Sequence, residues 1–137
     1  MSDLLDVSLL LACGWSSHAK HTAARAWLER QSAFTTSPLA ELGFLRVSMT
    51  PAYRASFADA QAALADITSR KQARWVPADL SAAKLPPLAS HAHVTDAYLV
   101  ELARAHGLKL ATLDDELCKQ PWAAGIAENP LRRHGHA

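Results

Sequence analysis

Short apolar runs of strand type alternate along this chain with segments of helical periodicity, and this alternation limits the folds open to it. The clearest helix runs from Thr95 to His106 and stops at Gly107, and a strand from Leu108 to Thr112 follows it directly. Strands that are joined by helices lie parallel in one sheet, with helices on its faces. The alternation therefore predicts an α/β fold with a central parallel sheet covered on both sides.

Capping and turn residues predict where the other elements begin and end. Ser37-Pro38 supplies an N-cap and a first helical residue, and Ser56 begins a capping box with Asp59. Besides 95–106, we expect helices at residues 18–31, 38–49 and 56–70, and helical turns near 81–84 and 115–119. Besides 108–112, we expect strands at residues 4–7, 34–36, 73–76 and 125–127, the first one running into the apolar segment 8–12.

Size and composition indicate one folded domain. Half of the 137 residues are hydrophobic. We assign residues 1–130 to the domain, and residues 131–137, which show no core pattern, to a mobile C-terminal tail. The net charge of +1 produces no general basic field, so a nucleic-acid partner would need a local positive patch.

The chain also lacks the sequence features of membrane and secreted proteins. No apolar stretch reaches the roughly 18 residues of a membrane span, and the N-terminal residues do not resemble a signal peptide. The two cysteines form no CxxC motif and suggest no disulfide framework. We therefore expect a cytoplasmic protein without a membrane partner.

Four acidic residues share one kind of position, at the end of an expected strand or at the start of an expected helix. They are Asp6, Glu41, Asp96 and Asp114. Ligand sites of α/β proteins form at this edge of the sheet, so four acids that are distant in the sequence would meet in one cleft. Carboxylates repel each other at short distance unless a cation or protons neutralise them. The cluster therefore predicts a site for a hard divalent ion, Mg²⁺ or Mn²⁺.

Each acid also has a purely structural explanation. Glu41 and Asp96 could stabilise helix N-termini, and Asp6 could cap the segment after the first strand. Asp114 could belong to a turn with Asp115. For a single residue the two explanations are equally good, but the convergence of four acids on one edge favours a metal site. Because a carboxylate-bound Mg²⁺ binds phosphates and activates water, the expected reaction is hydrolysis of a phosphodiester.

Four segments resemble the PIN domain, and more narrowly the toxin ribonucleases of VapBC toxin–antitoxin modules. They are Asp6-Val7-Ser8, the segment from Ser37 to Arg46, the segment from His93 to Leu99, and the segment from Leu110 to Asp114. The resemblance covers nearly the whole chain. It implies a three-layer α/β/α fold, a ribonuclease that depends on Mg²⁺ or Mn²⁺, and an RNA substrate. It further implies frequent homodimerisation and inhibition by a small cognate antitoxin protein.

The resemblance also implies roles for the four acids. Asp6, Glu41, Asp96 and Asp114 match the acidic quartet of the family, as catalytic residues. Three of them, Asp6, Asp96 and Asp114, are expected to be the metal ligands. Asp115 stands beside Asp114, and we choose Asp114 because it keeps the Thr-x-Asp spacing from Thr112. Ser8 and Thr112 could support the acids through hydrogen bonds.

Two other functions remain open. A phospho-accepting receiver-type domain would need an acidic pair after its first strand and a lysine after a late strand. Here Asp6 stands alone, and Lys109 lies at the start of its strand. A catalytically silent PIN-like scaffold would bind RNA or protein without cutting, but such a copy would be expected to have lost some of its acids.

Apolar residues of three helices are expected to exceed what a small sheet can cover. They are Trp15, Trp27 and Leu28 near the N-terminus, and Ala97, Leu99, Val100, Leu102 and Ala103 in the helix from Thr95. Exposed apolar patches usually mark interfaces. We therefore expect a homodimer, and a groove that accepts an amphipathic antitoxin segment.

Overall fold

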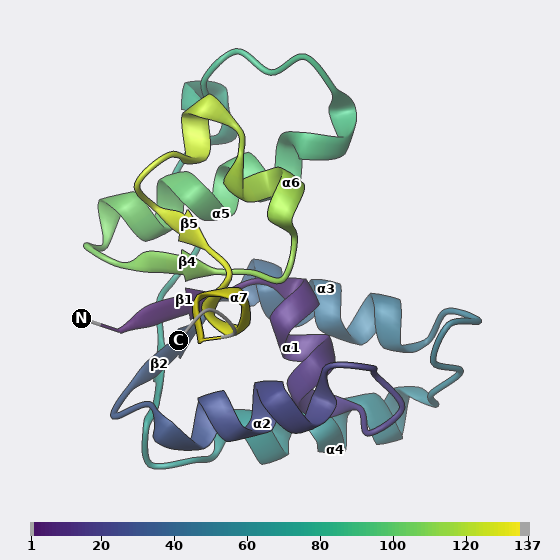
Figure 1. Cartoon of the computed structure of the whole chain (residues 1–137). Coiled ribbons are helices and arrows are strands. Elements are labelled where there is room, and N and C mark those ends of the chain that lie inside the picture. Colours follow the sequence, from purple (N-terminus) through teal and green to yellow (C-terminus); the bar gives the residue numbers. More distant parts are fainter. Residues whose placement is uncertain (1, 135–137) are drawn as a thin grey trace.

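A five-stranded parallel sheet forms the centre of the computed structural model, which describes residues 2–134 (Figure 1). The strands are β1 (Asp3–Leu5), β2 (Phe34–Thr36), β3 (Ala73–Trp75), β4 (Lys109–Ala111) and β5 (Ala127–Glu128). Their order in the sheet is β3-β2-β1-β4-β5. The chain crosses from β3 at one edge to β4 on the other side of β1, so the switch point of the sheet lies between β1 and β4. In open α/β sheets the ligand crevice lies at this switch point, beyond the carboxyl ends of the strands.

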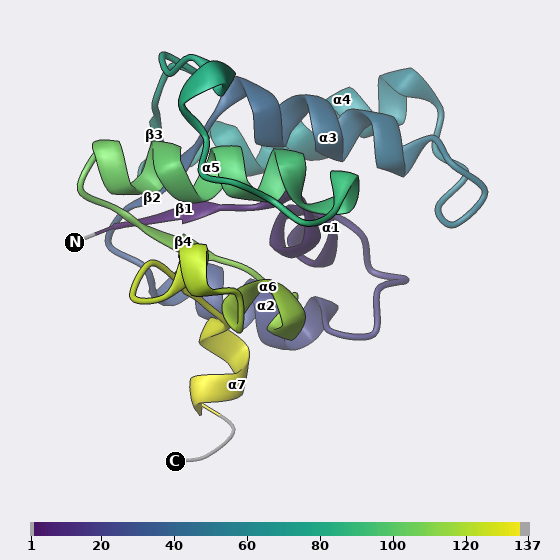
Figure 2. The same cartoon turned by 90° about the horizontal axis from the view of Figure 1, so that it is seen from above.

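The helices lie on both faces of this sheet. They are α1 (Val7–Gly14), α2 (His21–Arg30), α3 (Pro38–Ser48), α4 (Phe57–Thr68), α5 (Val94–Ala105), α6 (Asp115–Cys118) and α7 (Pro130–His134), with 3-10 turns at Ala82–Lys84, His91–His93 and Pro121–Ala123. Figure 2 shows α3, α4 and α5 on one face and α2, α6 and α7 on the other. The expected three-layer α/β/α arrangement is therefore confirmed. None of the described helices is long and apolar enough to span a membrane.

The core explains why apolar residues follow each other in the central strand β1. Leu4 and Leu5 follow each other in β1 and point to opposite faces, yet both are fully buried. Leu110 of β4 and Phe34 of β2 are buried beside them. A sheet with helices on both faces buries both sides of its central strands, and continuous apolar runs are the result.

The first helix was missed by the sequence interpretation, which expected a strand at residues 4–7. In the structure β1 ends at Leu5, and Asp6 caps α1 by accepting a hydrogen bond from the amide of Leu9. Residues Leu9 to Cys13 are all buried. A helix surrounded by protein has no polar face, so its sequence shows no helical period.

The C-terminal segment also differs from the expectation. A tail was expected from residue 131, but residues 130–134 form α7, and Leu131 packs against the core. Asn129 caps this helix, because its Oδ1 accepts hydrogen bonds from the amides of Leu131 and Arg132 at 3.1 and 3.2 Å. Residues 135–137 lie outside the described residues, so their expected mobility stays a prediction.

The expected surplus of apolar surface is wrong for the residues named. Trp27 and Leu28 are buried, and so are the five apolar residues of α5. Trp15 is half-buried, stacks on Phe44 with ring centroids 6.0 Å apart, and donates from Nε1 to Ser48 Oγ at 2.8 Å. The large hydrophobic side chains that the structure does expose are Leu42, Met49, Phe57, Trp75 and Val94.

Candidate metal centre

Asp6 lies directly after β1, at the switch point of the sheet. Its backbone amide donates to the carbonyl of Ala111 at 3.1 Å, which joins the end of β1 to the end of β4. Its Oδ1 accepts hydrogen bonds from Ser8 Oγ at 2.6 Å and from the amide of Leu9 at 3.1 Å. The residue is only 4% exposed, and none of the described ion pairs includes it. A buried carboxylate in this position requires a cation or a proton.

The pKa of Asp6 reflects this burial. Removal from water raises the pKa from 3.8 to about 6. The hydroxyls of Ser8 and Thr112 and the amide of Leu9 oppose the rise, and the charge of Asp96 adds to it. The supporting role expected for Ser8 is confirmed by its hydrogen bond to Asp6. The carboxyl group is therefore oriented by Ser8 and Leu9, and none of the described ion pairs gives it a positive partner.

Asp96 and Asp114 bring two further carboxyl groups to this place. Asp96 lies in the first turn of α5 and is half-buried. Burial raises its pKa, the charge of Asp114 raises it further, and His93 lowers it. Because Asp6 is in turn influenced by Asp96, three segments that are distant in the sequence contribute acids that act on one another.

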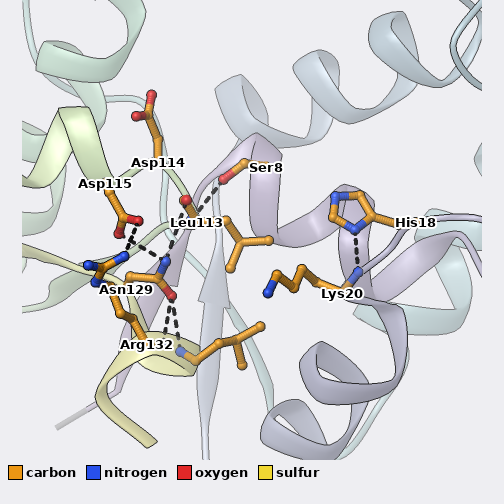
Figure 3. Close-up of a pocket in the computed structure, with 9 residues that line it drawn as sticks. Ser8, His18, Lys20, Leu113, Asp114, Asp115, Asn129 and Arg132 are labelled. Carbon is orange, nitrogen blue, oxygen red and sulfur yellow. Dashed lines mark hydrogen bonds and ion pairs between the residues drawn. The ribbon is translucent and has the colours of Figure 1, made fainter. Parts of the chain in front are cut away.

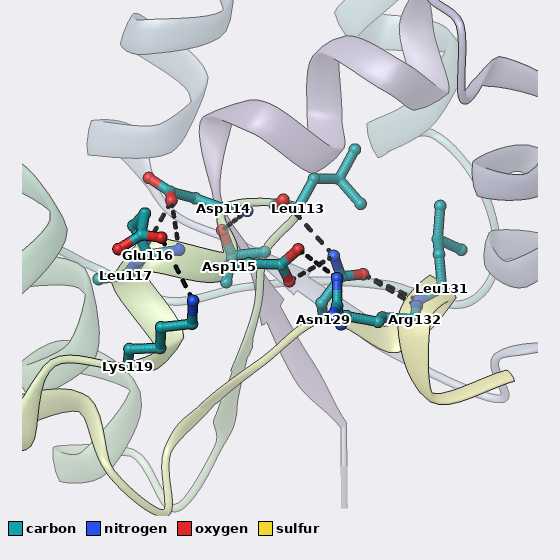
Figure 4. Close-up of polar contacts among 10 residues, drawn as sticks. Leu113, Asp114, Asp115, Glu116, Leu117, Lys119, Asn129, Leu131 and Arg132 are labelled. Atoms are coloured by element: carbon teal, nitrogen blue, oxygen red, sulfur yellow. Dashed lines mark hydrogen bonds and ion pairs between the residues drawn. The ribbon is translucent and has the colours of Figure 1, made fainter. Parts of the chain in front are cut away.

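Asp114 follows β4 and caps α6. Its Oδ1 accepts hydrogen bonds from the amides of Glu116 and Leu117 at 3.0 and 3.1 Å, while its own amide donates to Thr112 Oγ1 at 3.0 Å. Both capping bonds end on the same oxygen, as Figure 4 shows. The other oxygen, Oδ2, therefore takes no part in the cap.

The neighbouring Asp115 makes different contacts. It accepts hydrogen bonds from Asn129 Nδ2 at 3.2 Å and from Arg132 Nη1 at 2.9 Å (Figure 4). These contacts tie α6 to the start of α7. Both carboxylate oxygens of Asp115 thus accept hydrogen bonds, whereas the capping bonds of Asp114 use Oδ1 alone. This geometry favours Asp114 as the candidate ligand, in line with the choice made from the Thr-x-Asp spacing.

Glu41 lies in the first turn of α3, which Ser37 caps through a hydrogen bond to the amide of Ala40. Its Oε2 accepts a hydrogen bond of 2.7 Å from Thr36 Oγ1, at the end of β2. Since β2 pairs with β1, Glu41 belongs to the same edge of the sheet as Asp6. None of the hydrogen bonds of the described residues joins it to the other three acids.

The chemistry of these groups fits a hard divalent cation. Within residues 2–134, no three His, Cys, Asp or Glu side chains already form a cage for an ion. Mg²⁺ does not require one, because it keeps several waters and is usually held by one or two carboxylates together with substrate phosphates. Asp6, Asp96 and Asp114 could hold such an ion, and its charge would relieve their mutual repulsion.

A pocket of about 690 Å³ opens beside these acids (Figure 3). It is lined by Ser8, His18, Lys20, Leu113, Asp114, Asp115, Asn129, Leu131 and Arg132. Sequence reasoning missed Asn129, although Asn129-Pro130 is an N-cap followed by a proline at the first helical position. His18 and Lys20 belong to the loop between α1 and α2, and nothing in the local sequence connects them to the acids.

Comparison with known proteins agrees with this geometry. The PIN domain family model matches residues 4–123. Ribonuclease VapC39 of Mycobacterium tuberculosis is 35% identical over 93% of this chain and 99% of its own length. Ribonuclease VapC38 of the same organism is 36% identical over 81% of this chain and 84% of its own length.

A solved structure shows the same fold. The crystal structure of Mycobacterium tuberculosis VapC20, described as a sarcin–ricin loop cleaving toxin, matches with a TM-score of 0.66 at 19% identity. The match covers 91% of this chain and 96% of that one. Family model, full-length relatives and fold agree, and the chain therefore belongs to the PIN-domain family, among the VapC ribonucleases.

Proposed function

We propose that this protein is a metal-dependent endoribonuclease that hydrolyses RNA phosphodiester bonds as the toxin of a type II toxin–antitoxin module. The observation that carries the proposal is the buried carboxyl group of Asp6, which lies within the electrostatic influence of Asp96 at the sheet switch point. Relatives that match over nearly the whole chain are ribonucleases. A receiver-type domain has no support in these comparisons.

The four acids would have different roles in the proposed reaction. Asp6, Asp96 and Asp114 would hold Mg²⁺ or Mn²⁺, since carboxylate oxygens suit these hard ions better than zinc. When bound, the ion supplies positive charge for the phosphate and lowers the pKa of water. Glu41 would act as a general base through Oε1, because Thr36 holds Oε2. Ser8 fixes the orientation of Asp6 through its short hydrogen bond.

The proposed protein partner is the cognate antitoxin. A groove of about 500 Å³ between α3 and α4 is lined by Leu45, Ala58, Gln61, Ala62, Leu64, Ala65 and Thr68. The exposed Leu42 and Phe57 lie one helical turn from Leu45 and Gln61 on these helices. An amphipathic segment fits such a surface, and a basic side chain reaching the acids would neutralise them. This surface replaces the one expected from Trp15, Trp27 and Leu28.

The test is cleavage of tRNA and ribosomal RNA by the purified protein with Mg²⁺ or Mn²⁺, and with a chelator. We expect cleavage only with the ion, and Asp96→Asn should reduce the rate at least about 100-fold, as loss of one charge-stabilising group does in other enzymes. Asp59→Asn is the matched control, because Asp59 also lies in the first turn of a helix but is exposed, on α4.

Urea unfolding of the same variants separates chemistry from folding. Asp96→Asn should be as stable as the wild type or more so, because asparagine keeps the size and removes a repelling charge. Cleavage by Asp96→Asn at the wild-type rate would contradict the assignment. A wild type that binds RNA but does not cut it with either ion would instead favour the silent scaffold.

A further inference from the structure

The pocket beside the metal centre has a positive side that the proposed reaction does not use. Ser8 and Asp114 belong both to the pocket and to the acid centre, so the pocket borders the acids directly. His18 and Lys20 enter the pocket from the loop between α1 and α2, and Arg132 enters it from α7. An RNA strand with its scissile phosphate at the acids would pass through this space.

Lys20 is the cation of this pocket that can bind a ligand phosphate. Arg132 is paired with Asp115 at 2.9 Å, so its charge is largely compensated. Lys20 is exposed, and none of the described ion pairs includes it. Figure 3 shows its ammonium group pointing into the pocket, toward Asn129. A chain with a net charge of only +1 needs such a local cation to hold a polyanion beside several acids.

His18 adds a neutral donor next to Lys20. Its Nδ1 accepts a hydrogen bond from the backbone amide of Lys20 at 2.9 Å, which places the ring proton on Nε2. Burial, followed by the charges of His21 and Lys20, lowers its pKa. The ring is therefore neutral near pH 7 and offers one N–H group without adding a second charge.

The opposite wall is held by hydrogen bonds and is partly apolar. Asn129 donates to the carbonyl of Leu113 and to Asp115, and accepts from the amides of Leu131 and Arg132. Its side-chain amide thus donates two and accepts two hydrogen bonds within this wall. Leu113 and Leu131 supply apolar surface that could cover a sugar or an unstacked base. The volume of about 690 Å³ lies within the usual range of about 300–1,000 Å³ for ligand pockets.

We propose that this pocket binds the nucleotide next to the scissile phosphate of single-stranded RNA. Lys20 Nζ and His18 Nε2 contact its phosphate, and Leu113 and Leu131 cover its sugar or base. Single strands fit because their bases are free to leave the stack, whereas those of a duplex are not. The assignment rests on the proposed ribonuclease function and adds a binding site for the substrate beyond the acids.

The test compares Lys20→Ala with Lys71→Ala, both in the non-cleaving Asp96→Asn protein. Lys71 is a matched control, because it is also exposed but precedes β3, at the other edge of the sheet. Binding of a short fluorescein-labelled single-stranded RNA of random sequence is followed by anisotropy over a range of KCl concentrations. Lys20→Ala should weaken binding several-fold and reduce the slope of log K against log salt by about 0.7, the value for one phosphate contact. Lys20→Arg should restore both.

A kinetic measurement in the active protein checks the same contact. Lys20→Ala should raise KM and leave kcat nearly unchanged, because the contact is the same in the ground state and the transition state. Equal effects of Lys20→Ala and Lys71→Ala, or an unchanged salt slope, would overturn the pocket assignment and leave the ribonuclease proposal intact. If Asp96→Asn bound no RNA and the wild type cleaved none, both the pocket assignment and the ribonuclease proposal would be overturned.

Discussion

Asp6 and Asp114 are N-caps of helices as well as candidate metal ligands. In each residue Oδ1 accepts amide hydrogen bonds from the following helix, α1 for Asp6 and α6 for Asp114. The structural and functional explanations of these acids are therefore compatible. The cap orients each carboxyl group before an ion binds, which reduces the cost of organising the site.

Metal binding should depend on the ionisation of Asp6. Because burial raises its pKa to about 6, protons compete with the ion below that value. The increase in Tm caused by Mg²⁺ should be large near pH 8 and should nearly vanish near pH 5. Thermal unfolding with and without Mg²⁺ measures it. A shift in Tm that is the same at both pH values would contradict the role of Asp6 as a ligand.

Without metal, the same carboxyl group should make the protein less stable as pH rises. Between pH 3.8 and about 6 the folded state binds more protons than the unfolded state, so the free energy of unfolding falls through this window. The loss is up to about 3 kcal/mol, at about 1.4 kcal/mol per pKa unit. Asp6→Asn should remove most of it in urea titrations with a chelator, whereas Asp59→Asn should not.

Variants of the two neighbouring acids after β4 should differ in their effects on Mg²⁺ binding and stability. Asp114→Asn should weaken Mg²⁺ binding in calorimetric titrations and largely keep the cap of α6, since asparagine is also a good N-cap. Asp115→Asn should leave Mg²⁺ binding unchanged and cost about 1 kcal/mol or less, because its partner Arg132 is well exposed. The reverse pattern would make Asp115 the ligand.

At the scale of elements, the approach of α3 to α1 sets the spacing between Glu41 and Asp6. A Cβ on Gly43 would lie 2.5 Å from Val7 Cγ2, which is closer than real Cβ atoms come. Val7 follows Asp6 at the start of α1, and Gly43 lies two residues after Glu41 in α3. The absence of a side chain at residue 43 thus lets α3, which carries Glu41, approach the start of α1, which Asp6 caps.

Gly43→Ala should therefore destabilise the protein and slow cleavage. Alanine improves helix propensity by about 1 kcal/mol, but the clash with a stiff β-branched side chain costs more. We expect a net loss of about 1–3 kcal/mol in urea unfolding. The double variant Val7→Ala/Gly43→Ala should lose less free energy of unfolding than the two single variants lose together. A double-mutant cycle measures this difference. Strict additivity would show that the two residues do not make this contact.

At the scale of the whole molecule, the monomer covers its own core, and five large apolar side chains of the described residues remain exposed. Phe57 borders the α3–α4 groove that we assign to the antitoxin, whereas Trp75 lies on β3. We still expect a homodimer, formed away from that groove. Its basis is the resemblance to VapC toxins together with exposed residues such as Trp75, rather than the buried Trp27 and Leu28.

Sedimentation at micromolar concentration tests this expectation. The wild type should sediment as a dimer, and Phe57→Lys should leave the dimer intact while weakening the complex with the antitoxin, because a charge in an apolar groove is costly. A protein that remains monomeric would contradict the dimer. Dissociation by Phe57→Lys would place the second copy, rather than the antitoxin, on the α3–α4 surface.

Local signals determined most of the elements. Ser37 and Ser56 cap α3 and α4 as expected, and Gly107 ends α5 with a φ of +69°. Such signals act between residues a few positions apart, so the sequence alone shows them. The alternation of strands and helices also determined the edge on which the four acids lie, because the carboxyl ends of parallel strands meet there.

Tertiary structure alone decided what surrounds those acids. The amide of Leu113 donates to Ser8 Oγ across 105 positions of sequence, and Lys20 faces Asn129 across one pocket. Burial decides whether a carboxyl group such as Asp6 has a raised pKa, and whether an all-apolar segment such as α1 is a helix. Burial depends on how distant segments pack, so no local pattern in the sequence could have shown either.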